Sequence, residues 1–121
     1  MREVHSPVQL TPRDPAAHKG DFGKVLVVAG SRGMSGAAVL CGTAVMKSGA
    51  GLCTVASPAS ILATVAAGFP CYTTHALPED QAGTLTVEAI EMLVKLAGGR
   101  TVVALGPGLG RSDGTTLLVR S

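Results

Sequence analysis

The run KVLVVAGSRGMSGAAVL, residues 24–40, joins a short apolar stretch to a glycine turn and then to a second apolar stretch. Lys24 to Ala29 is continuously β-branched and apolar, which predicts a strand buried on both faces. Gly30, Gly33 and Gly36 follow at three-residue spacing. A strand, a tight turn and a helix in this order form the repeating unit of a layered α/β protein.

The same order of strand and helix recurs along the chain. Further strands are predicted at residues 52–56, 71–75 and 101–105, and a loop at residues 77–84. The first helix is predicted to start at Ser35 or Gly36 and to end near residue 48, and further helices are predicted at residues 58–68, 86–97 and 113–121. Ser57 would cap the second helix, Thr86 the third, and Ser112 or Asp113 the last. The alternation predicts an α/β fold with a parallel sheet covered on both faces.

Three expectations about burial follow from this pattern. The first helix is apolar nearly all round, so we expect it to be largely covered. The strand at 101–105 reads TVVAL and is expected to be buried. The third helix should turn one face to the core, formed by Val87, Ile90, Val94 and Ala97.

The composition favours one domain with an aliphatic core. The 121 residues are 46% hydrophobic, 15% charged and 2% aromatic, with a net charge of +2. Scattered Lys and Arg without aromatic partners argue against a nucleic-acid partner. Residues 48–78 carry no charge, but Pro58, Gly68 and Pro70 interrupt them, so no membrane-spanning helix is expected. Residues 1–20 lack the apolar core of a signal peptide, and we expect a cytoplasmic protein.

The cysteines and histidines do not form a recognisable catalytic or metal-binding pattern. Cys41, Cys53 and Cys71 include no C-x-x-C pair and are interpreted as small buried hydrophobes in a reducing compartment, with a metal site or a catalytic thiol as the alternatives. Asp21 is expected to cap a turn. Surface or hydrogen-bonded positions are expected for the three histidines, His5, His18 and His75.

Two glycine clusters, Gly30–Gly36 and Gly106–Gly110, each follow a predicted strand directly. The carboxyl ends of parallel strands lie at one edge of a sheet, and ligands bind beyond that edge. We therefore predict that the two turns meet there.

The first glycine cluster lacks residues that two well-known phosphate-binding motifs require. A P-loop needs a Lys after its last glycine, whereas Ala37 and Ala38 follow Gly36. A dinucleotide fingerprint would need G-x-G-x-x-G and an acidic residue closing the second strand, and Ala56-Ser57 supply none. A cradle of backbone N–H groups for another phosphate-bearing ligand remains, beside the simpler interpretation as a tight turn. Because no general base is identifiable near the serines of the first cluster, the residues indicate binding more clearly than chemistry.

Four motifs together resemble the ADP/ATP-dependent NAD(P)H-hydrate dehydratases, a branch of the ribokinase-like superfamily. They are HKGDFGK at 18–24, GSRGMSGA at 30–37, SGAGL at 48–52 and GPGLG at 106–110, and the likeness covers residues 18–113. The resemblance implies a ribokinase-like fold and an enzyme that removes water from hydrated NADH or NADPH at the expense of ADP or ATP, with Mg²⁺. A phosphoryl group is thought to turn the ring hydroxyl into a better leaving group.

The resemblance also suggests which residues bind the substrate. It implies that Ala37 and the turn at 106–110 line the site of the hydrated dinucleotide, with Gly108 as the best single choice. Joined to the predicted cradle, this gives the candidate substrate-binding residues Gly30, Ser31, Gly36, Ala37, Gly106 and Gly108.

One departure from the family concerns length. Members run to about twice this length or more, beyond the usual domain size of ~100–150 residues. The nucleotide-binding K-G turn and the G-T-G-D segment with the expected catalytic Asp have no counterpart before Ser121. We therefore expect residues 1–20 to be an arm and residues 21–121 the N-terminal half of the domain, with no catalytic or metal-binding residue in this chain and a homo-oligomeric state.

Three alternative functions remain open from the sequence. The chain could be a non-catalytic nucleotide-binding module or a fragment of a ribokinase-like sugar or vitamin kinase. It could also be a structural half-domain whose exposed sheet edge needs a partner.

Overall fold

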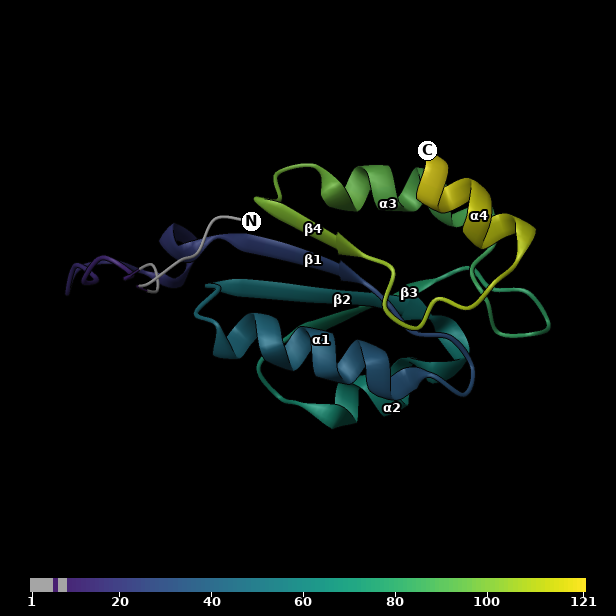
Figure 1. Ribbon diagram of the computed structural model, residues 1–121, viewed down its shortest axis with the longest axis horizontal. Helices are drawn as coiled ribbons and strands as arrows, with labels where there is room; N and C mark the ends of the chain where they lie inside the picture. Colours follow the sequence, from purple (N-terminus) through teal and green to yellow (C-terminus); the bar gives the residue numbers. More distant parts are fainter. Residues whose placement is uncertain (1–5, 7–8) are drawn as a thin grey trace.

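The computed structural model describes residue 6 and residues 9–121. Its centre is a four-stranded parallel sheet with the order β3-β2-β1-β4 (Figure 1). The strands are β1 (Lys24–Val28), β2 (Leu52–Pro58), β3 (Thr73–Leu77) and β4 (Val102–Leu105). The predicted α/β class with a parallel sheet is confirmed.

The position of β1 inside the sheet determines where the chain reverses direction. Val25 of β1 lies opposite Cys53 of β2 on one side and opposite Val102 of β4 on the other. From β1 the chain moves outward through β2 to β3, and it then returns to place β4 on the far side of β1. The strand order therefore reverses between β1 and β4.

The helices cover both faces of the sheet (Figure 1). Helices α1 (Ser35–Lys47) and α2 (Leu62–Gly68) lie on one face, and α3 (Ala89–Ala97) and α4 (Asp113–Arg120) lie on the other. Two 3-10 turns, η1 (Lys19–Phe22) and η2 (Ala59–Ile61), precede β1 and α2. Within the described chain, no helix combines the length and apolarity that crossing a membrane requires.

Alternate side chains of β1, together with Ala29 directly after it, belong to two separate cores. Leu26 and Val28 pack in the cluster beneath α3 and α4, whereas Val27 and Ala29 pack in the cluster beneath α1 and α2. All four residues are at most 1% exposed. Successive side chains of a strand point to opposite faces, so an uninterrupted apolar run is what a strand buried on both sides requires. The prediction for this strand is confirmed.

The predicted helix start at Ser57-Pro58 is wrong. Both residues are buried and end β2, where they lie opposite Ala76 and Leu77 of β3. Helix α2 begins only at Leu62, after η2. Pairing with β3 outweighs the local helix-start signal of Ser-Pro, because each further pair extends the ladder and keeps apolar surface out of water. β3 correspondingly spans 73–77 and not 71–75.

The start and the buried face of the third helix also differ from the prediction. The N-cap is Glu88 and not Thr86, whose hydroxyl instead hydrogen-bonds the Glu88 carboxylate and lowers the pKa of that carboxyl group. Val87 and Val94 are exposed. The side chains that pack on the core are Ala89, Ile90, Met92, Leu93, Leu96 and Ala97. Because the helix begins two residues later than predicted, Val87 lies before it. Val87 therefore does not share the helical face on which it was predicted to lie.

Two elements are less covered than their sequences suggest. Three of the four β4 side chains are 39–53% exposed, because β4 pairs with β1 alone. In α1, Leu40 is 73% exposed on the side away from the sheet. The predictions that these elements are largely buried are therefore wrong for this chain. The cap predicted at Ser112 is confirmed, since its Oγ accepts a hydrogen bond of 3.0 Å from the Thr115 backbone N–H.

The cysteine prediction holds only in part. Cys53 is buried, Cys41 is half-buried and Cys71 is exposed, so the expectation is wrong for Cys71. Cys71 precedes the edge strand β3, where nothing in the described chain packs over its side chain. His18 and Asp21 behave as expected, because they form a reciprocal capping box around η1. His75 is half-buried within β3, and His5 lies outside the described residues.

Candidate functional site

The two glycine turns leave the sheet side by side. Residues 30–34 follow β1 and residues 106–110 follow β4, and these strands are neighbours at the reversal of strand order. One turn leads to α1 on one face and the other leads to α4 on the opposite face (Figure 1). In open parallel sheets, this divergence creates the crevice in which ligands bind. The prediction that the two turns meet is confirmed.

Direct hydrogen bonds hold the two turns together. The Gly30 backbone N–H donates to the Pro107 carbonyl oxygen at 2.8 Å. The Ser31 hydroxyl donates to the Gly108 carbonyl oxygen at 2.7 Å. Both bonds link positions about 77 residues apart, so the tertiary fold and not local sequence creates them.

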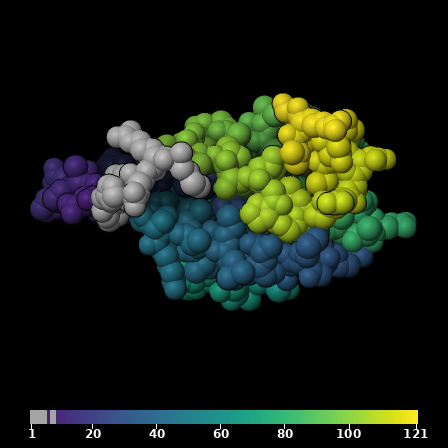
Figure 2. Space-filling view, viewed as in Figure 1, coloured from purple at the N-terminus to yellow at the C-terminus, as the bar shows by residue number. Residues whose placement is uncertain are grey.

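Gly108 makes the closest approach between the turn after β4 and helix α1. Its φ is +68°, and a Cβ built there would lie 2.6 Å from the Ala37 Cβ and 3.2 Å from the Met34 carbonyl oxygen. Any side chain at this position would be both sterically excluded and conformationally strained. A space-filling view shows the yellow-green turn lying on the blue start of α1 (Figure 2). The small residues Gly108 and Ala37 therefore permit this contact.

The first turn of α1 presents backbone donors at the same edge. Its N-cap, Met34, makes no side-chain capping hydrogen bond, and the first turn contains no acidic residue. Gly36 is exposed, and a Cβ added there would meet nothing within 4 Å. The first N–H groups of a helix lack acceptors four residues earlier and carry the positive end of the helix dipole. In α1, the Ala37 N–H donates to the Met34 carbonyl oxygen at 3.2 Å, so the N–H groups before it are the ones a ligand would meet. This surface is suited to an anionic group of a ligand.

The six candidate residues divide into two groups. Gly30 and Ser31 are buried, and their donors are engaged with the second turn, so they position the turns. Gly36 and Gly106 are exposed, while Ala37 and Gly108 are half-buried. These last four residues form the surface that a ligand can reach. The substrate-binding role of all six residues stays a prediction.

A third segment, at residues 80–84, completes the edge. The sequence predicted a loop here but not its contacts with the two glycine turns. The Arg32 backbone N–H donates to the Gly83 carbonyl oxygen at 3.0 Å, and its Nη1 donates to the Gln81 carbonyl oxygen at 2.7 Å. On its other side, the loop approaches the turn after β4, because a Cβ at Gly110 would lie 3.2 Å from Thr84 Cγ2. The loop thus braces both glycine turns.

Asp80 organises this loop. Its carboxylate accepts the Thr84 backbone N–H at 2.9 Å and the Thr84 hydroxyl at 2.6 Å. These hydrogen bonds lower the pKa of the Asp80 carboxyl group, with the hydroxyl as the largest cause. The sequence DQAGT at 80–84 carries the turn signature that could have identified this role, namely an Asp followed by Gly and Thr.

The groups at the edge are suited to binding. The hydrogen-bond acceptor of the Ser31 hydroxyl is a carbonyl oxygen, whereas an activated serine would need a basic side chain there. Among residues 9–121, no three His, Cys, Asp or Glu side chains gather in a way that could hold a metal ion. The described residues thus provide a cradle without a metal-ligand set.

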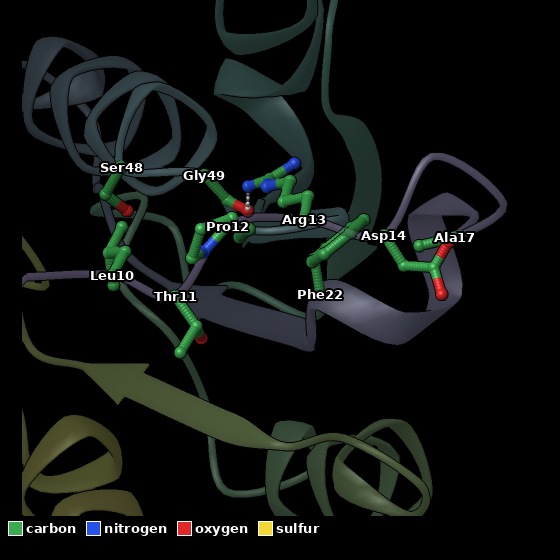
Figure 3. A pocket seen from close by; sticks show the side chains of 10 residues that line it. Leu10, Thr11, Pro12, Arg13, Asp14, Ala17, Phe22, Ser48 and Gly49 are labelled. Atoms are coloured by element: carbon green, nitrogen blue, oxygen red, sulfur yellow. Dashed lines mark hydrogen bonds between the residues drawn. The ribbon is translucent and has the colours of Figure 1, made fainter.

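Two hollows lie at the opposite edge of the sheet, where the strands begin. One of about 510 Å³ lies at the starts of β2 and β3, and another of about 430 Å³ lies beside the arm (Figure 3). In the second, the Arg13 guanidinium stacks 3.9 Å from the centre of the Phe22 ring and donates to the Gly49 carbonyl oxygen at 2.8 Å. Arg13 therefore holds the arm against the turn that follows α1. This hollow is lined by the arm and that turn, and not by the two glycine turns.

Comparison with protein families and known proteins agrees with the geometry. Residues 25–121 match the family model described as NAD(P)H-hydrate dehydratase. The bifunctional NAD(P)H-hydrate repair enzyme of Thermofilum pendens is 40% identical over 97% of the chain. The ADP-dependent (S)-NAD(P)H-hydrate dehydratase of Lactiplantibacillus plantarum is 32% identical over 84% of the chain.

Two solved structures share the fold. A ribokinase-like superfamily protein of Enterococcus faecalis covers 91% of the chain with a TM-score of 0.74 and 25% identity. The ADP/ATP-dependent NAD(P)H-hydrate dehydratase of Bacillus subtilis, co-crystallised with ATP and Mg²⁺, covers 92% with a TM-score of 0.71 and 26% identity.

The chain spans only part of these proteins. It matches 22% of the Thermofilum pendens enzyme, 33% of the Lactiplantibacillus plantarum enzyme and 37% of the Bacillus subtilis chain. The family model nevertheless covers all the described strands and helices from β1 onward, apart from the first residue of β1. The chain therefore belongs to the NAD(P)H-hydrate dehydratase family, with a ribokinase-like fold.

Proposed function

We propose that this chain forms part of the substrate-binding wall of an enzyme that dehydrates hydrated NADH or NADPH, using ADP or ATP. The observation that carries the proposal is the meeting of the two glycine turns where the strand order reverses, in a chain of this family. The names of the relatives from Lactiplantibacillus plantarum and Bacillus subtilis support the use of ADP or ATP.

In this proposal, the chain binds and orients the substrate. A phosphate of the dinucleotide lies against the free N–H groups at the start of α1, where the exposed Gly36 leaves room for it. Gly106 leaves room for the ligand to approach the backbone of the second turn, and Gly108 holds that turn against the start of α1. When bound, ADP or ATP would supply a phosphoryl group that makes the ring hydroxyl a better leaving group. Mg²⁺ would accompany the nucleotide phosphates, which the co-crystallisation of the Bacillus subtilis relative with ATP and Mg²⁺ supports.

A chimaeric enzyme tests the proposed function. The chain is joined to the two thirds of the Lactiplantibacillus plantarum dehydratase that it does not match, and the product is given NADH hydrate and ADP. We expect the absorbance of reduced nicotinamide to recover in an ADP-dependent manner. Phosphorylation of a sugar or vitamin without dehydration would identify a kinase, and nucleotide binding without turnover would identify a non-catalytic module.

In this chimaera, Ala37→Leu tests the position of the substrate. Leu has nearly the helix propensity of Ala, but it adds bulk where Ala37 faces Gly108. We expect affinity for the hydrated dinucleotide to fall at least tenfold, which is ~1.4 kcal/mol. The melting temperature is measured on the same protein, because overpacking against the turn costs about 1–3 kcal/mol of stability. A stability loss with unchanged affinity would show that Ala37 only packs the helix against the turn.

A further inference from the structure

Met34 is an exposed residue that packs along the turn after β4. It lies directly before α1 and is 42% exposed. A Cβ built at Gly108 would lie 3.3 Å from the Met34 Cβ, and a Cβ built at Gly110 would lie 3.7 Å from the Met34 methyl carbon. The Met34 side chain therefore extends from one glycine of this turn to the next, while part of its surface remains in contact with water.

The end of the Met34 side chain lies where three segments meet. The Cβ position at Gly110 is also 3.5 Å from the Ser31 hydroxyl oxygen and 3.2 Å from Thr84 Cγ2. Ser31 belongs to the turn after β1, and Thr84 belongs to the loop at 80–84. Methionine is unbranched and flexible, and it fills irregular gaps of this kind. The Met34 thioether thus contributes to the packing that holds the carboxyl edge together.

The other methionines of the described chain are better protected. Met46 packs against the core beneath α1 and α2, and Met92 packs against the core beneath α3 and α4. Both are half-buried, whereas Met34 is exposed. An oxidant must reach the thioether sulfur, so exposure determines which methionine reacts first. Met34 is therefore the described methionine that is most open to oxidation.

We propose that Met34 is a peroxide-sensitive modification site, and that its oxidation loosens the turn after β4 from the start of α1 and weakens substrate binding. Hydrogen peroxide transfers one oxygen atom to the Met34 sulfur, so that an S–O bond forms and the O–O bond breaks. The sulfur is oxidised by two electrons to the sulfoxide, and the peroxide is reduced to water. Methionine sulfoxide reductases reverse this modification.

The sulfoxide cannot keep the packing of the thioether. Its oxygen adds bulk beside Gly110, and the S–O group is polar where the thioether was apolar. The oxidised side chain is therefore expected to turn toward solvent. The hydrogen bonds from Gly30 to Pro107 and from Ser31 to Gly108 remain, so the turn loosens without unfolding of the chain. The modification itself does not depend on the proposed function, whereas its effect on substrate affinity rests on it.

Treatment of the 121-residue chain with hydrogen peroxide tests the site. Peptide mass spectrometry should show that Met34 is oxidised at least fivefold faster than Met46 and Met92. In concentrated urea the three rates should converge, because the fold provides the protection. Hydrogen exchange at the amides of residues 108–110 should become at least threefold faster after oxidation. Methionine sulfoxide reductases should restore the original exchange, and circular dichroism shows whether the oxidised chain has kept its fold.

Matched variants assign the effect to Met34. Met34→Leu keeps an apolar side chain of similar volume without sulfur, so its exchange at residues 108–110 should not respond to peroxide. Met92→Leu removes a methionine from the core and should respond as the wild type does. Met34→Gln carries a polar group at a similar distance from the backbone, and it should show the faster exchange without peroxide.

The chimaeric enzyme tests the effect on binding. Peroxide treatment should lower the affinity of the wild-type chimaera for NADH hydrate at least threefold, and it should leave that of Met34→Leu at its untreated value. A wild-type chimaera that neither binds nor dehydrates NADH hydrate would contradict the proposed function and not the modification site, which the exchange measurements decide.

Three outcomes would overturn the proposal. The first is oxidation of Met46 or Met92 in the folded chain as fast as that of Met34. The second is unchanged exchange at residues 108–110 when Met34 is fully oxidised, or an equal response of the Met34→Leu variant. The third is an active chimaera whose affinity for NADH hydrate does not change on oxidation of Met34.

Discussion

At the scale of single residues, the absence of a side chain decides how the two turns fit together. Ala37 and Met34 pack against Gly108 in the space that a Cβ would otherwise occupy. The Gly108 carbonyl oxygen also accepts a hydrogen bond from the buried Ser31 hydroxyl. Gly36 directly precedes Ala37 in the sequence, but a Cβ added at Gly36 would lie in open space. The two glycines therefore serve different purposes, one permitting close packing and the other leaving room beside the free N–H groups of α1.

Gly108→Ala and Gly36→Ala should consequently have opposite effects on stability. Ala at position 108 must adopt a positive φ and clash with Ala37, so we expect a loss of about 2 kcal/mol or more in the free energy of unfolding. Ala at position 36 meets nothing and stiffens the first turn of α1, so we expect a gain of about 0.5–1 kcal/mol. Urea unfolding measures both effects. Equal effects of the two substitutions would mean that Gly108 does not pack against α1 in solution.

The cysteines should differ in reactivity. Burial and, to a smaller extent, the nearby Cys41 raise the pKa of the Cys53 thiol, and Arg100 lowers it in part, so that it reaches about 11. Burial also raises the pKa of Cys41. Because the thiolate is the reactive form, iodoacetamide should modify the exposed Cys71 first and Cys53 only when the chain opens. Mass spectrometry over time measures the order, and Cys71→Ser should remove the fast phase. Equally rapid modification of Cys53 would mean that β2 opens frequently.

At the scale of elements, short loops between the strands determine the shape of the carboxyl edge. The loop at 80–84 contributes no regular structure, yet its carbonyl oxygens at Gln81 and Gly83 accept hydrogen bonds from Arg32 in the turn after β1. The Thr84 side chain lies close to Gly110 in the turn after β4. The conformation of the loop depends on one carboxylate, that of Asp80, which accepts two hydrogen bonds from Thr84.

This loop should make stability depend on pH on the acid side. The folded-state pKa of Asp80 is lower than its ordinary value of 3.8, so its contribution is present above pH 3.8 and is lost as pH falls through the folded value. Asp80→Asn should therefore destabilise the chain near neutral pH and have a smaller effect at acid pH, where the Asp80 carboxylate is protonated. Thr84→Val removes the hydroxyl donor and should reduce the same pH dependence. Thermal unfolding at several pH values measures it, and parallel curves for wild type and Asp80→Asn would contradict the assignment.

At the scale of the whole molecule, the carboxyl edge of the sheet is built from backbone groups and small residues. The described chain brings together backbone donors, glycines and a small alanine at this edge. The Ser31 hydroxyl already donates its hydrogen bond to the Gly108 carbonyl oxygen. The described chain also leaves an apolar strand edge uncovered. Both features agree with a chain that spans about a third of the length of the ADP-dependent relative.

The isolated chain should bind without turning over. Because the expected catalytic Asp segment has no counterpart before Ser121, purified 1–121 should not dehydrate NADH hydrate with either ADP or ATP. The assay is the recovery of reduced-nicotinamide absorbance, with the chimaeric enzyme as the positive control. Any ADP-dependent recovery by the chain alone would place the catalytic groups within these 121 residues.

The sequence by itself determined the alternation of strands and helices, the apolar run of β1 and the two glycine turns that follow strands. These features are local, because an apolar run, a cap or a glycine turn acts over a few residues. The motif order also predicted the family correctly. The cap at Ser112 and the capping box at Asp21 follow from equally local chemistry.

Only the tertiary structure decided which strands are neighbours. The place of β4 beside β1 brings residues about 77 positions apart into hydrogen-bond contact, and nothing local specifies that pairing. The same pairing buried Gly30 and Ser31, and pairing with β3 drew Ser57-Pro58 into β2 and away from a helix start. Local propensities amount to tenths of a kcal/mol per residue, about 0–0.7 for ordinary residues in a helix, so long-range pairing and burial override them wherever the two disagree.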